Sequence, residues 1–78
     1  MTRTAQAQAL FSSFLQPSDR PSAGQIAQAV RDGLRRHGGP DGCAALVAAE
    51  YGEHPAEAAA RMRWALAVTS LPAPVPTG

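Results

Sequence analysis

The sequence predicts a small all-α domain built from four short helices. Apolar side chains recur at helical spacing, most clearly at Ile26, Val30 and Leu34. Ser22 and Gln25 have the spacing of a capping box, which marks the start of a helix. Proline and glycine separate four such segments, and no stretch shows the alternating pattern of a β-strand.

The first expected helix covers residues 4–16. Two i,i+4 pairs place bulky apolar side chains on one face of it: Leu10 with Phe14, and Phe11 with Leu15. Pro17 ends this helix, because the residue before a proline is disfavoured in the helical region. This helix is expected to cover the open side of the core.

The second expected helix covers residues 22–37 and begins at the capping box. Gly38, Gly39 and Pro40 end it, because glycine accepts the left-handed conformation of a helix end and proline cannot continue a helix. Its last turn carries three basic side chains near the negative end of the helix dipole: Arg35, Arg36 and His37.

The third and fourth helices are expected to form a helix-turn-helix. The third runs from an N-cap at Asp41 to Tyr51 and ends at Gly52, which can take a positive φ. The fourth begins near Pro55 and reaches Ser70. Small Ala48 is expected to let the two helices cross closely, together with four further contact positions: Val47, Tyr51, Ala58 and Met62.

The 78 residues suffice for one domain, predicted as residues 1–71 with a proline-rich, disordered tail at 72–78. Alanine supplies much of the apolar content, so the predicted core is thin and a protein partner is credible. The candidate core side chains are Leu10, Phe11, Phe14, Leu15, Ile26, Val30, Leu34, Leu46, Val47, Tyr51, Met62, Trp64, Leu66, Val68 and Leu71.

Charge and cysteine content argue against several classes of protein. A net charge of +1 gives no overall attraction to nucleic acid. The single cysteine, Cys43, forms no internal disulfide and suits a reducing cytoplasm, and we find neither an export signal nor an apolar run long enough for a membrane span. Cys43, His37 and His54 match no zinc or nucleophile spacing, so the sequence predicts no enzyme, no metal and no cofactor.

The pattern from residue 47 to residue 65 resembles a known family. Its matching positions are Val47-Ala48, Tyr51-Gly52, Ala58, Arg61-Met62 and Ala65. They resemble the helix-turn-helix of the promoter-binding C-terminal module of bacterial sigma factors and of related response-regulator output domains. The resemblance implies a small transcription-associated regulator whose last helix contacts DNA. Under this interpretation, the arginines that contact phosphate are Arg35, Arg36, Arg61 and Arg63.

A second hypothesis stays open beside this one. Alanines leave few groups on the last helix to read base edges, and glutamates place negative charge where the helix would approach DNA. The chain would then be a non-enzymatic protein-docking module, binding a protein of the transcription machinery or a second copy of itself. The residues assigned to that role are Glu53, Glu57, Ala60 and Trp64. Trp64 is also a candidate for the core.

Overall fold

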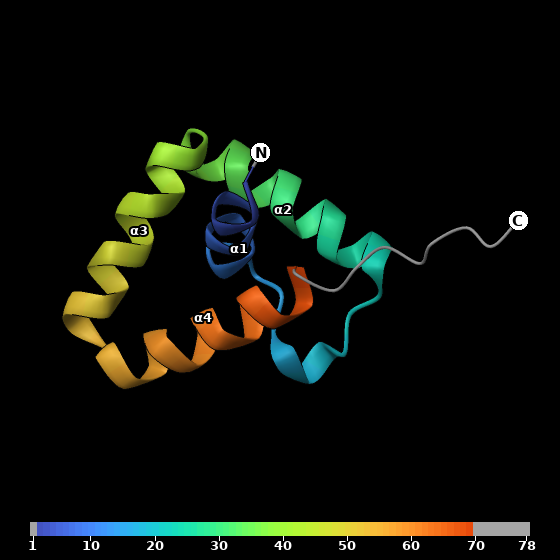
Figure 1. The fold of residues 1–78 in the computed structure, drawn as a ribbon. Coiled ribbons are helices and arrows are strands. Elements are labelled where there is room, and N and C mark those ends of the chain that lie inside the picture. The colour runs from blue at the N-terminus through green and yellow to red at the C-terminus, as the bar shows by residue number, and fades with distance from the viewer. Residues whose placement is uncertain (1, 70–78) are drawn as a thin grey trace, which may run out of the picture.

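The computed structural model describes residues 2–69, and within that range the chain is all-α (Figure 1). The prediction of a four-helix, all-α domain is confirmed. The elements are α1 (Arg3–Phe11), a 3₁₀ turn η1 (Pro17–Asp19), α2 (Ala23–His37), α3 (Pro40–Glu53) and α4 (Pro55–Thr69). Residues 70–78, with the predicted tail and Leu71, lie outside the described range. None of the described helices combines the length and the apolar character that a bilayer span requires.

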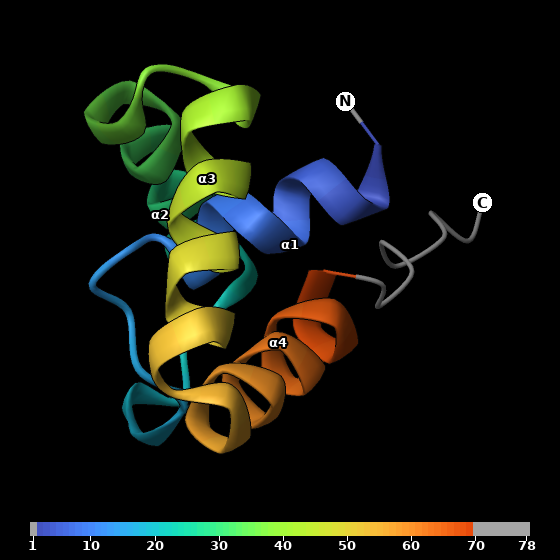
Figure 2. The same cartoon turned by 90° about the vertical axis from the view of Figure 1, so that its left-hand side faces the viewer.

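Helix α1 is the centre of the molecule and not a cover on its open side, which corrects the prediction. It packs against α2, α3 and α4, which surround it in Figures 1 and 2. Ala7, Ala9 and Leu10 are fully buried. Two alanines with one leucine give α1 a small cross-section, so three helices can approach it closely.

Helix α1 ends at Phe11, five residues before the predicted end. Two serine hydroxyls add hydrogen bonds to carbonyls of its last turns: Ser12 Oγ donates to Gln8 O at 2.8 Å, and Ser13 Oγ donates to Leu10 O at 2.6 Å. The backbone N–H groups of the same serines donate to the same two carbonyls. The chain leaves the helix before Phe14, so the two predicted i,i+4 pairs do not form. Phe14 is therefore exposed and is not a core residue.

Helix α2 begins and ends as predicted. The backbone N–H of Ser22 donates to Gln25 Oε1 at 2.8 Å, and the N–H of Gln25 donates to Ser22 Oγ at 3.2 Å. Gly38, with a φ of 77°, ends the helix. Within α2, a Cβ at Gly33 would stand 2.2 Å from Ala9 O, so only glycine allows α2 to cross α1 this closely.

Helices α3 and α4 meet at a corner, but the joint differs from the predicted one (Figure 1). Gly52 is helical, and the single non-helical residue is His54, with φ of −138° and ψ of 66°. Pro55 provides the physical reason, because it disfavours the helical conformation at the residue before it. At its other end, α3 begins at Pro40, one residue before the predicted N-cap.

The inner side of this corner is filled by α1. Phe11 packs with Val47 of α3 and Ala58 of α4, and Met62 lies against the same cluster. Val47, Ala58 and Met62 are thus contact positions, as predicted. Ala48 and Tyr51 face solvent, which corrects the expectation that a small residue at 48 permits a direct crossing.

Candidate functional site

The most exposed large apolar side chain of the described residues lies in the segment between α1 and η1. Residues 12–16, which we name the Phe14 loop, present the Phe14 ring with 76% of its surface exposed. Burial of an aromatic side chain stabilises a fold by about 1.5–3 kcal/mol, and the domain forgoes most of that contribution here. The exposed ring is therefore a candidate contact for another molecule.

The guanidinium of Arg61 holds the backbone of this loop from the α4 side. Its Nε donates to Phe11 O at 2.8 Å, and its Nη2 donates to Ser13 O and Leu15 O, both at 2.9 Å. A longer contact of 3.4 Å joins Nη2 to Leu10 O. One planar cation thus binds the carbonyl of the last α1 residue, Phe11, and the carbonyls of two loop residues, Ser13 and Leu15.

These contacts give Arg61 a structural role. Its guanidinium is half-buried, and burial lowers the pKa of Arg61 from its ordinary value, although an arginine stays cationic at neutral pH. Its ring neighbours are Phe11 and Trp64, whose centroids lie 5.6 and 5.2 Å from the guanidinium carbon. Within this structure the cation of Arg61 faces backbone carbonyls and aromatic rings, and the phosphate contact at Arg61 stays a prediction.

His37, at the end of α2, holds the same loop from a second helix. Its Nε2 lies 3.1 Å from Ser12 O, a carbonyl that Arg61 does not contact. The backbone that presents Phe14 is therefore fixed by side chains from two helices. A ring presented on such a backbone loses little conformational freedom when it binds.

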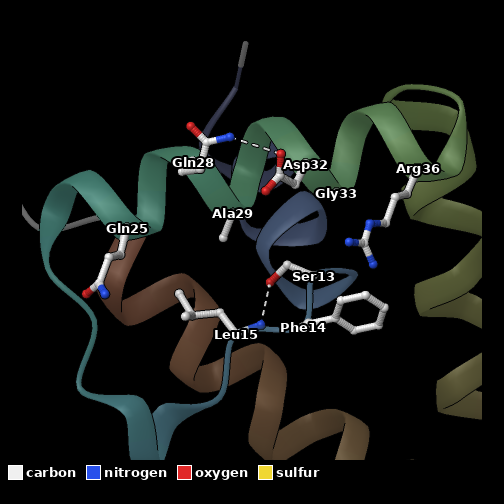
Figure 3. A pocket seen from close by; sticks show the side chains of 9 residues that line it. All are labelled: Ser13, Phe14, Leu15, Gln25, Gln28, Ala29, Asp32, Gly33 and Arg36. Carbon is white, nitrogen blue, oxygen red and sulfur yellow. Dashed lines mark hydrogen bonds between the residues drawn. The ribbon is translucent and has the colours of Figure 1, made fainter.

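The Phe14 ring itself is positioned by Arg36. The guanidinium carbon of Arg36 lies 3.9 Å from the ring centroid, in cation–π contact. Figure 3 shows the Arg36 side chain descending from α2 toward the ring. The contact is worth about 0.5–1 kcal/mol at an exposed site, which is enough to favour one orientation of the ring.

An open hollow of about 320 Å³, which we name the α2 hollow, separates the Phe14 loop from α2. Leu15 and Ala29 form apolar parts of its wall, and Gln28 and Asp32 stand at its rim, joined by a hydrogen bond of 3.0 Å (Figure 3). The complete lining is Ser13, Phe14, Leu15, Gln25, Gln28, Ala29, Asp32, Gly33 and Arg36.

A second hollow, of about 300 Å³, lies on the other side of Phe14 and Arg36, toward α3 and α4. Phe11, Leu46 and Ala58 supply its apolar lining, and Glu50 and Glu57 add negative charge. Phe14 therefore projects between two depressions. An aromatic knob next to apolar hollows is an arrangement that binds another apolar side chain.

The other residues predicted to bind nucleic acid lie on separate helices. Arg35 and Arg36 are exposed on α2, where Arg35 lies 3.7 Å from Asp32, and Arg63 is exposed on α4. Helix α1 lies between α2 and α4 in Figure 1. With Arg61 turned inward, the predicted set does not form one group around α4.

The residues predicted to bind a protein partner also divide into two groups. Glu53, Glu57 and Ala60 are exposed on α3 and α4, and Glu57 lines the second hollow. Trp64 is partly buried and packs against the core, which agrees with the prediction that it is a core residue. Phe14 is a core residue in the sequence prediction and not a site residue, although the Ser12-Ser13 pair before it is a signal that a helix can end there.

The side chain of Cys43, the single cysteine, makes a structural contact in the core. Cys43 is fully buried, and its thiol donates to Gly33 O at 3.5 Å. Within residues 2–69, no three side chains of histidine, cysteine, aspartate or glutamate form a cluster that could hold a metal ion. Comparison of the chain with protein-family models, curated proteins and solved structures gives no match.

Proposed function

We propose that the chain is a non-enzymatic protein-docking module that binds its partner at the surface formed by Phe14, Arg36 and the two hollows beside them. The single observation that carries this proposal is the Phe14 ring, 76% exposed on a loop that two other helices hold in place. Burying such a ring in a partner would contribute about 1.5–3 kcal/mol of binding free energy.

The surface of α4 supports docking to protein over contact with DNA. A helix that reads the major groove presents side chains that hydrogen-bond base edges. The exposed positions of α4 instead include Ala56, Glu57 and Ala60, with Arg63 as the exposed cation. Contact with a protein of the transcription machinery remains within this proposal, as one class of partner.

Site-specific photo-crosslinking tests the proposed function. A photoreactive phenylalanine analogue replaces Phe14 in one variant and Tyr51, which is 40% exposed on α3, in a matched control. Irradiation in cells that express the chain is expected to yield a protein adduct at position 14 and much less at position 51. An adduct at position 14 that nuclease removes and protease does not, or no adduct there at all, would overturn the proposal.

Retention on duplex DNA gives the complementary measurement. If four arginines contacted phosphate, DNA affinity would fall with salt with a log–log slope of about −3.6. The docking proposal expects no retention of the chain on duplex DNA at low salt. Retention that is lost in a variant with Arg35, Arg36 and Arg63 all changed to alanine would favour the DNA-binding hypothesis.

A further inference from the structure

The geometry points to a second copy of this chain as the partner. In this dimer the two molecules meet at the α2 hollow, and each inserts its Phe14 ring into the hollow of the other. This inference rests on the proposed docking function and names its occupant. It also differs from the homodimer expected from sequence, because the contact lies on α2 and the Phe14 loop and not on the alanine-rich face of α4.

The shape of the surface is complementary to itself. A two-fold interface uses the same patch on both molecules, so the patch has to carry a projection and a matching depression. Phe14 is the projection, and the α2 hollow beside it, at about 320 Å³, is larger than one phenyl ring. Because Phe14 also forms part of the wall of that hollow, the two rings would lie next to each other across the axis, as aromatic pairs favour.

The charges on the rim are also complementary to themselves. Asp32 and Arg36 are four residues apart on α2, so they lie on one face of the helix, and both line the α2 hollow. In the proposed dimer the two-fold axis is perpendicular to α2 and passes between these two residues, which sets the second α2 antiparallel to the first. Asp32 then faces the partner's Arg36, and Arg36 faces the partner's Asp32. A strongly charged partner of either sign would meet one attractive and one repulsive group here.

The surface is formed before the partner arrives. Arg61 and His37 fix the loop backbone, and Arg36 fixes the ring, through contacts within one molecule. Association therefore requires little rearrangement, which lowers the cost of binding. Because the contact involves one helix and one loop, we expect a reversible dimer with a dissociation constant on the order of 10–100 μM.

Sedimentation equilibrium of the purified full chain, from about 1 μM to about 1 mM, tests the dimer. Phe14→Ser is expected to raise the dissociation constant at least tenfold. Its circular dichroism spectrum should be unchanged, because the ring contributes little to the core. Tyr51→Ser removes the other exposed large aromatic side chain of the described residues and should leave the dissociation constant within about twofold of the original.

Charge reversal tests the orientation of the two molecules. Asp32→Arg alone and Arg36→Asp alone each place like charges opposite one another in the proposed dimer, so each purified variant should be more monomeric than the original chain. An equimolar mixture of the two variants restores both attractive pairs. The mixture is therefore expected to form a heterodimer at concentrations where neither variant dimerises alone.

Three results would overturn the inference: a monomer at every concentration, a dimer that Phe14→Ser leaves intact, or charge-reversal variants that do not associate when mixed. These results are separable from a failure of the proposed function. A photo-crosslink from position 14 to a different protein, together with a monomer at every concentration, would keep the docking function and exclude the second copy as the partner. The absence of any protein adduct at position 14 would remove both.

Discussion

Replacing Arg61 with alanine is expected to destabilise the domain by about 2–4 kcal/mol. Three of its hydrogen bonds are 2.8–2.9 Å long and accept at carbonyls of Phe11, Ser13 and Leu15. Hydrogen bonds from a charged donor contribute about 1.5–3 kcal/mol each, which would sum to more. The expected loss is smaller because the site is only part-buried and water can reach some of the freed carbonyls.

A loss of this size is large for a domain of 78 residues, whose total stability is about 4–12 kcal/mol. The melting temperature should fall by about 10–25 °C. Urea unfolding, followed by far-ultraviolet circular dichroism and by fluorescence of the single tryptophan, Trp64, measures the change directly.

Two variants set the scale of this measurement. Arg63→Ala removes an exposed arginine from the same helix and should change stability by less than about 0.5 kcal/mol. Arg61→Lys keeps the charge but loses the planar arrangement of N–H donors, so we expect its free energy of unfolding to lie between those of Arg61→Ala and the original protein. If the free energies of unfolding of Arg61→Ala and Arg63→Ala differ by less than about 0.5 kcal/mol, the structural role assigned to Arg61 is wrong.

Four further substitutions, of which Gly24→Ala is a control, test the helix backbone and the capping box. Gly52→Ala should stabilise the domain by about 0.5–1 kcal/mol, because Gly52 is helical and a Cβ there meets nothing within 4 Å. A lower free energy of unfolding in urea would instead support the predicted turn with a positive φ at Gly52. Gly33→Ala should destabilise the domain by about 1–3 kcal/mol or more through its clash with Ala9 O. Gly24→Ala, on the same helix, should not lower the melting temperature, because its Cβ would make only an ordinary contact of 4.0 Å with Ser22 Oγ. Ser22→Ala should cost about 1 kcal/mol, and a melting temperature equal to that of the original would contradict the capping box.

The parts of the fold that follow local rules could be predicted from sequence. The Ser22 capping box and the left-handed Gly38 set the bounds of α2, and Pro55 set the start of α4. The joint between α3 and α4 was misplaced because two signals competed. Gly52 permits a turn but does not require one, whereas Pro55 acts on the conformation of His54 whatever the tertiary context.

The site could not be predicted because it depends on contacts far apart in sequence. Arg61 lies 50 residues from Phe11, and only the packed fold brings its guanidinium to that carbonyl. Phe14 was assigned to the core because its spacing from Leu10 suits a helix. The helix instead ends at Phe11, where the hydroxyls of Ser12 and Ser13 bind carbonyls of the last turns. The two serines are compatible both with a helix that continues to Phe14 and with one that ends before it, so the sequence does not decide between them.

The central position of α1 has a consequence for synthesis on the ribosome. The helix that every other helix packs against is the first of the four to be translated, and α4 is the last. Until α4 emerges, the nascent chain carries the apolar face of Leu10 and Phe11 without its complete set of partners. A truncated product that lacks α4 is therefore expected to stay unfolded and to be a substrate for proteases.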